Sequence, residues 1–158
     1  ASGIPIVGEK TFGKGTVQNA ENFSDGSTVK LTIAKWLTPN GNWIHEKGIE
    51  PQYKAELPSY AKLPYLDPKK KYQSGSTGDE VKVAQEMLKA LGYNVKPTGS
   101  FDDQTVQAVK AFQNDQKLKT TGIITGETTS GMTVKLQDKL SKHDTQLEKA
   151  IEIVKKEK

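Results

Sequence analysis

Lys14 lies between Gly13 and Gly15, and Gln18 follows four residues after it. A lysine amine acts as a general base only in its neutral form, although the pKa of a free lysine side chain is about 10.4. Burial or a neighbouring positive charge favours the neutral form, and flanking glycines let the backbone approach closely. The Gln18 amide could accept a hydrogen bond from the amine without adding negative charge. These residue types therefore suit a lysine base that activates a nucleophile.

Two other interpretations apply to the same run. Gly8, Gly13 and Lys14 match the beginning of a phosphate-binding loop, G-x-x-x-x-G-K-[ST]. Position 15 is glycine instead of the hydroxyl residue that would hold magnesium, and the following residues have the composition of a strand, whereas a phosphate loop leads into a helix N-terminus. The other interpretation is a surface turn with a solvated lysine, which Gly-Lys-Gly alone would favour.

The longer run that ends at Gln18, Val-Gly-Glu-Lys-Thr-Phe-Gly-Lys-Gly-Thr-Val-Gln, resembles the general-base segment of the C-terminal processing peptidase family. Two later stretches are similar to the same family, a Thr-Pro-x-Gly turn at 38–41 and a Gly-Ile-x-Pro stretch at 48–51, where Gln52 replaces the usual Asp. The resemblance implies a Ser-Lys serine peptidase in which Lys14 is the base and Gln18 orients it.

The same resemblance implies that the nucleophilic serine lies upstream of residue 1, because Ser2 is too close to Lys14 along the chain for the family arrangement. The complete protein would then be an exported endopeptidase, secreted or on the extracytoplasmic face of a bacterial membrane, with a PDZ domain upstream. It would cleave proteins with apolar C-terminal tails, form a homodimer, and need no metal or cofactor. This chain alone would hold half of an active site and be inactive.

The elements that would position Lys14 lie in residues 1–57, which have a β-rich pattern. Residues 28–34 alternate apolar and polar side chains, which predicts a half-buried strand, and Asp25-Gly26 predicts a turn from a preceding strand. The resemblance makes this region part of a crotonase-like α/β protease core. Residues 58–77 contain three prolines, three consecutive lysines and a Ser-Gly-Ser-Thr run, which indicates a linker.

Residues 78–131 have the spacing of amphipathic helices, with a helix stop at Gly92. The segment resembles a small three-helix peptidoglycan-binding domain through Gly78-Asp79-Glu80-Val81, Leu91-Gly92-Tyr93, Gly99-Ser100-Phe101 and Phe112-Gln113. The apolar residues would build the bundle, so a ligand would contact polar and aromatic loop residues. We select Tyr93 and Asp102 on that basis. The alternative interpretation is a helical bundle that has only a structural role and binds no ligand.

Residues 132–158 contain an apolar stripe with helical spacing on a charged background. Its members are Leu136, Leu140, Leu147, Ile151 and Val154. The run from Asp144 onward is similar to the segment that closes the protease domain in the C-terminal processing peptidases, with Thr145 in place of the usual Pro. Three functions stay open: part of an endopeptidase, a non-catalytic peptidoglycan-binding module or, through this stripe, a dimerisation element.

The composition excludes several other classes. The chain has no cysteine, which excludes disulfides, thiol catalysis and cysteine-ligated zinc, and its two histidines lack a metal-ligand pattern. Its net charge of +4 comes without a nucleic-acid motif, which argues against a nucleic-acid partner. The expected fold class is α+β: a β-rich fragment of a protease core, a three-helix bundle and a C-terminal helix.

Overall fold

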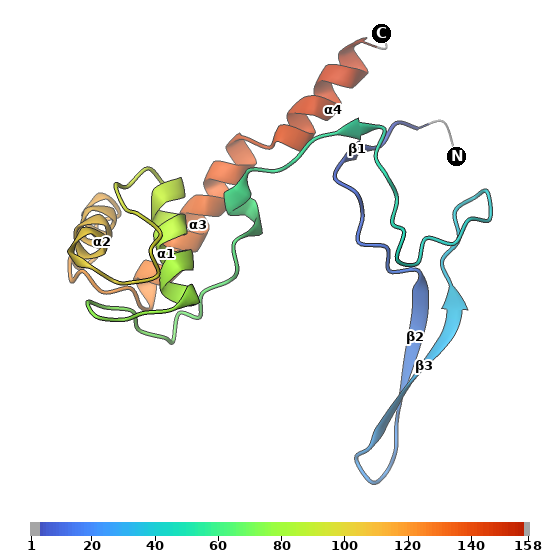
Figure 1. The fold of residues 1–158 in the computed structure, drawn as a ribbon, viewed down its shortest axis with the longest axis horizontal. Coiled ribbons are helices and arrows are strands. Elements are labelled where there is room, and N and C mark those ends of the chain that lie inside the picture. Colours follow the sequence, from blue (N-terminus) through green and yellow to red (C-terminus); the bar gives the residue numbers. More distant parts are fainter. Residues whose placement is uncertain (1–3, 157–158) are drawn as a thin grey trace. The chain divides into compact units, whose positions relative to one another are not determined.

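The computed structural model describes residues 4–156, which contain both strands and helices and confirm the predicted α+β class (Figure 1). The chain divides into two compact units, which we name unit 1 and unit 2. Unit 1 contains the residues up to Glu56 together with those from Gln146 onward, and unit 2 is the continuous segment Leu57–Thr145. Within the described residues, no helix is both long and apolar enough to cross a lipid bilayer.

The longest strands of unit 1 form an antiparallel hairpin, in which β2 (Thr16–Asn22) pairs with β3 (Thr28–Lys35). Asp25 stabilises the turn between them, because one of its carboxylate oxygens accepts hydrogen bonds from the backbone N–H and the hydroxyl of Ser27. The turn predicted from Asp25-Gly26 is therefore present, and it joins the two strands that the alternating pattern indicates.

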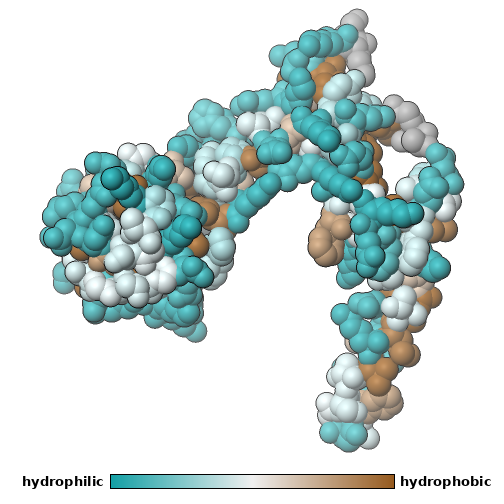
Figure 2. Space-filling model, viewed as in Figure 1, coloured by the Kyte–Doolittle hydropathy of each residue, from teal (hydrophilic) through white to brown (hydrophobic). Residues whose placement is uncertain are grey.

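The burial of β3 differs from the expectation. Leu31 is 54% exposed and Ile33 is 64% exposed, so the strand is not half-buried. The reason is that the hairpin is a sheet of only two strands among residues 4–156, and no second layer of this chain covers its apolar side chains. Apolar surface is visible along the hairpin in Figure 2.

A second, short pairing in unit 1 is parallel and joins β1 (Val7–Gly8) to β4 (Tyr53–Lys54). The C-terminal helix α4 (Thr145–Lys156) belongs largely to the same unit. Its Gln146 side-chain amide donates a hydrogen bond of 3.1 Å to the backbone carbonyl of Ala55, directly after β4. Helix α4 therefore returns to the strands that lie on either side of the Lys14 segment in sequence.

Three helices form unit 2: α1 (Asp79–Ala90), α2 (Asp103–Asp115) and α3 (Glu127–Lys142). The apolar residues at helical spacing turn towards one another and are almost completely buried, as the pattern predicts. They include Val81, Ala84, Leu88, Val109, Phe112, Met132 and Leu136. The bundle thus has a continuous hydrophobic core of its own.

Two features of unit 2 were not expected. Helix α3 continues through Gly131, where we expected the helical domain to end. The segment 58–77, for which we expected a linker, adds Leu66 and Tyr72 to the buried core. The backbones of Tyr72 and Ile124 also exchange two hydrogen bonds of 2.9 Å.

Two buried glutamines hold the loops that follow α1 and α2. The Gln85 amide nitrogen donates to the carbonyl of Ser100 and to the hydroxyl of Thr105, both at 2.8 Å, and its carbonyl oxygen accepts from the backbone N–H of Gly99. Gln113 makes the same kind of contacts one helix later. Each buried amide therefore has partners for its donor and acceptor atoms, as a stable core requires.

Candidate active site

The loop that carries Lys14 is held by hydrogen bonds to a facing segment of unit 1. The backbone N–H of Glu46 donates to the carbonyl of Gly13 at 2.9 Å. The backbone N–H of Thr11 donates to the carbonyl of Ile49 at 3.0 Å, and the N–H of Ile49 donates back to the Thr11 hydroxyl at 2.8 Å. The Lys14 loop is thus paired with a second segment of backbone.

This close approach requires glycine on both sides of Lys14. A Cβ atom on Gly13 would lie 2.7 Å from the backbone nitrogen of Gly48, and Gly13 has a φ of +84°. A Cβ atom on Gly15 would overlap the backbone of His45. Strand β2 begins directly after Gly15, so there is no helix N-terminus to hold a phosphate and the phosphate-loop interpretation has no structural basis.

Lys14 and Gln18 are both exposed, the first in the loop and the second on β2. A bulge between Val17 and Gln18 interrupts the pairing of β2 with β3. Among residues 4–156, no hydrogen bond or ion pair reaches the Lys14 amine or the Gln18 amide. The structure therefore does not join Lys14 to Gln18, whose role stays a prediction, and Ser2 lies outside the described residues.

Tyr93 and Asp102 lie in unit 2, and both make internal contacts. The Tyr93 hydroxyl donates to Asp115 at 2.9 Å, and its ring packs edge-on against Phe112. Burial, followed by the hydrogen bond to Asp115, raises the pKa of Tyr93 to about 12. Asp102 is the N-cap of α2, and hydrogen bonds from the hydroxyl and the backbone N–H of Thr105 hold its pKa below the ordinary value. Contact of either residue with a ligand stays a prediction.

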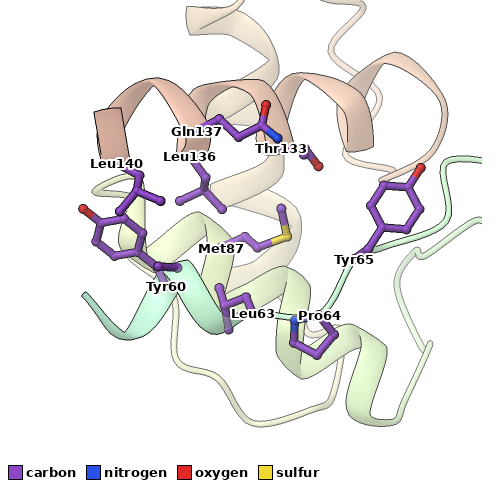
Figure 3. Close-up of a pocket in the computed structure, with 10 residues that line it drawn as sticks. Tyr60, Leu63, Pro64, Tyr65, Met87, Thr133, Leu136, Gln137 and Leu140 are labelled. Atoms are coloured by element: carbon purple, nitrogen blue, oxygen red, sulfur yellow. The ribbon is translucent and has the colours of Figure 1, made fainter. Parts of the chain in front are cut away.

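Two of the grooves in unit 2 differ in the chemistry of their lining. The first, of about 240 Å³, is lined by uncharged side chains, which include Tyr60, Leu63, Tyr65, Met87, Thr133 and Gln137 (Figure 3). The second, of about 290 Å³, places Tyr93 beside three lysines of α3, which are Lys135, Lys139 and Lys142. Asp102 lines neither groove. In the part of the chain that the structure describes, no group of three His, Asp or Glu side chains could hold a metal ion.

One contact at the Lys14 loop has no signal in the sequence. The indole N–H of Trp43 donates to the carbonyl of Gly15 at 2.8 Å. No motif or period links two positions that are 28 residues apart. Only the tertiary structure brings this side chain to the loop.

Two family models match separate parts of the chain. Residues 2–55 match peptidase family S41, and residues 77–132 match a peptidoglycan binding domain. The first match contains Lys14 and Gln18, and the second contains Tyr93 and Asp102.

Individual proteins match over nearly the whole chain. It is 63% identical over 157 residues to the carboxy-terminal processing protease CtpA of Bacillus subtilis, with coverage of 99% of this chain and 34% of that protein. It is 42% identical over 149 residues to CtpB of the same species, with coverage of 92% and 31%. A solved structure of a peptidoglycan-binding protein from Clostridioides difficile has 40% identity and a TM-score of 0.42, with 42% of each chain covered. The chain spans about a third of the length of the curated relatives it matches.

Proposed function

We propose that this chain, whose residues 2–55 match peptidase family S41 and which is 63% identical to a carboxy-terminal processing protease, is part of a serine endopeptidase in which Lys14 is the general base. The observation that carries this proposal is the loop itself. Two glycines that tolerate no side chain place Lys14 against a facing backbone segment, and its amine has no partner among the described residues. Lys10, in contrast, lies 3.9 Å from the carboxylate of Glu50 as an ordinary surface ion pair.

The nucleophilic serine would come from a part of the protein outside this chain, so the chain alone would be inactive. As the serine oxygen attacks the scissile carbonyl, Lys14 accepts its proton and then donates that proton to the leaving amine. A water molecule next attacks the acyl-enzyme, and Lys14 accepts a proton from that water. The ester bond to the serine then breaks, and Lys14 returns the proton to the serine oxygen. Gln18 would orient the amine in both steps through its amide.

A neutral lysine needs a low-polarity or cationic environment, and Lys14 is exposed in unit 1. We propose that the rest of the protease core provides this environment when it packs on unit 1. The exposed apolar side chains of the hairpin, which include Phe23, Leu31 and Ile33, are the surface on which that core would pack. The substrate would be a protein with an apolar C-terminus, as the resemblance to the family implies.

The test is proteolysis of an unfolded protein by the complete protein that contains this chain. Lys14→Met keeps the length of the side chain but has no basic group, so we expect loss of activity of at least about a thousandfold with an unchanged melting temperature. Lys30→Met is the matched control, because Lys30 is an exposed lysine on β3 of the same unit. Full activity of Lys14→Met would exclude Lys14 as the base.

A second function, attachment to the cell wall, is favoured by the match of residues 77–132 to a peptidoglycan binding domain. We propose that unit 2 retains the protease at peptidoglycan, outside the cytoplasm. Co-sedimentation of the complete protein with purified peptidoglycan tests this, and Tyr93→Ala is expected to reduce the bound fraction. A protein that stays entirely in the supernatant at low salt would exclude anchoring.

A third function, dimerisation, is favoured by the apolar stripe of α4. Leu147 and Val154 are each 55% exposed, and Ile151 is 45% exposed. Two copies of this stripe could pack together as a helix pair. Light scattering on the complete protein should then show a dimer that Ile151→Glu dissociates, whereas a monomeric wild type would exclude this function.

A further inference from the structure

The carbonyl group of Gly15 accepts two hydrogen bonds, one from the Trp43 indole N–H at 2.8 Å and one from the backbone N–H of Trp36 at 3.0 Å. On the other side of Lys14, the carbonyl of Gly13 accepts the bond from Glu46. Lys14 therefore lies between two glycine carbonyls that are both fixed. Since glycine has the freest backbone of all residues, these bonds decide which conformation the loop adopts.

The Trp43 indole is itself held in place. Its ring stacks on His45, with ring centroids 4.9 Å apart and an angle of 24° between the planes. The Lys35 amine lies 4.5 Å from the centroid of the indole, which is the geometry of a cation–π contact. The backbone of Trp43 also forms a β-bridge with Leu37. The donor that reaches Gly15 is thus positioned by its ring and by its backbone.

The Trp43 bond differs from the other bonds to these two carbonyls because its donor belongs to a side chain. The bonds from Glu46 and Trp36 come from backbone N–H groups and do not depend on the identity of those residues. A substitution at position 43 can therefore release one side of the Lys14 loop while the backbone pairing persists.

We propose that Trp43 is a positioning residue for the general base, which acts by fixing the Gly15 carbonyl and thereby the direction in which Lys14 leaves the loop. This inference rests on the proposed function of Lys14. A general base must reach its proton at hydrogen-bond distance, and a misplacement of about 1 Å can reduce the rate about a hundredfold. Loss of the Trp43 hydrogen bond, which is one of several contacts of the loop, should therefore lower the rate by less than about a hundredfold.

The experiment is steady-state proteolysis by the complete protein with Trp43→Phe, which keeps an aromatic ring but removes the N–H group. We expect kcat to fall about tenfold, equivalent to about 1.4 kcal/mol, with little change in KM. The low-pH limb of the pH–rate profile should also move to higher pH, because a less confined amine is more often solvated and protonated. A loss of folded protein would instead lower the rate equally at every pH.

Ser141→Ala is the matched control. It removes a side-chain donor to a backbone carbonyl at a similar distance, 2.9 Å, in unit 2. Its kcat and pH–rate profile should equal those of the wild type. Lys14→Met is measured beside it, so that failure of the base assignment is seen separately from failure of the positioning role.

Two results would overturn the positioning role of Trp43. The first is an inactive Lys14→Met together with a Trp43→Phe enzyme that has wild-type kcat and pH–rate profile. If Trp43→Phe melts below the assay temperature, benzothienylalanine is incorporated at position 43 alone, since this analogue has the shape of tryptophan without the N–H group. An unchanged kcat in that protein is the second such result. An active Lys14→Met would instead refute the proposed base, and with it the inference that rests on it.

Discussion

Unit 2 buries most of its large apolar side chains, and unit 1 exposes most of its own. Among residues 4–156, the hydrophobic core cluster runs from Leu66 to Leu136 and lies entirely in unit 2, whereas Ile153 is the one buried hydrophobic residue of unit 1. Phe12 in unit 1 is 95% exposed, and Phe112 in unit 2 is 1% exposed. The same residue type therefore has opposite environments in one chain.

This difference shows what an apolar pattern can and cannot indicate. The alternation in β3 and the helical spacing in α1 each identify an apolar face correctly. The pattern does not indicate whether the surface that covers this face belongs to the same chain. In unit 2 the covering elements are neighbours in sequence, and in unit 1 they are absent from residues 4–156.

The two units also differ in how far their polar side chains have hydrogen-bond partners. The buried glutamines of unit 2 have partners for both ends of their amides. In unit 1, Lys14 and Gln18 are polar, exposed and without partners among the described residues. Unit 2 has the features of a self-contained domain, and unit 1 has those of a surface that completes its contacts elsewhere.

The largest effect on stability should come from a substitution of Phe112. Phe112→Ala leaves a cavity in a closed core, so we expect a loss of about 3–5 kcal/mol in the free energy of unfolding. Phe12→Ala is the matched control and should change this free energy in the 158-residue chain by less than about 0.5 kcal/mol. Urea unfolding measures both, and equal losses would contradict the contrast between the units.

The next effect concerns the buried amides. Gln113→Leu would leave the backbone N–H groups of Thr121 and Gly122 without their acceptor, which is 2.9 Å away in the wild type. Unsatisfied buried donors cost about 1–3 kcal/mol each, so we expect a loss of about 2–4 kcal/mol by urea unfolding. Gln107→Leu, at an exposed position on the same helix, is the control and should be nearly neutral. A neutral Gln113→Leu would mean that water replaces the lost acceptor.

A smaller loss of stability, but a large loss of activity, should follow from Gly15→Ala. The added methyl group overlaps the backbone of His45, so the Lys14 loop must shift. We expect a loss of about 1–3 kcal/mol in stability and about a hundredfold in kcat of the complete protein. Gly26→Ala is the control, because its methyl group meets no atom within 4 Å although φ is +84°. Comparable activity in the two variants would argue against a catalytic role for the loop.

The smallest effect should be that of the α2 cap. Asp102→Ala removes the N-cap and should cost about 1 kcal/mol at neutral pH. The pKa of the Asp102 carboxyl is lowered in the folded protein from an ordinary value of 3.8, so this contribution is complete above that value and is lost as the pH falls through the folded pKa. Urea unfolding at pH 7 and at pH 2 should show the difference between the variant and the wild type shrinking with acid.

Asp102→Asn refines the same comparison, because asparagine is also a good N-cap. We expect its stability at neutral pH to be close to that of the wild type. Weaker co-sedimentation of Asp102→Asn with peptidoglycan, at unchanged stability, would show that the carboxylate contacts the ligand. Unchanged co-sedimentation would leave Asp102 with its capping role alone.

Local sequence patterns determined the elements of this protein. The spacing of apolar residues predicts α1 and α2, and Asp25-Gly26 predicts the hairpin turn, because these signals depend on neighbours a few residues away. The residue types around Lys14 suit base chemistry, but the prediction that Lys14 is the base came from the resemblance of the longer run to a known family.

Tertiary structure alone decided the contacts that are distant in sequence. It placed Tyr72 from the expected linker in the core and brought the Trp43 indole to the Gly15 carbonyl. It also explained why glycine is required on both sides of Lys14, because the backbone of a facing segment leaves no room for a side chain there. The physical reason is that nearly every residue has the same backbone donor and acceptor, and that many side chains could fill a given space in a core. A sequence therefore does not specify which of them meet until the chain has folded.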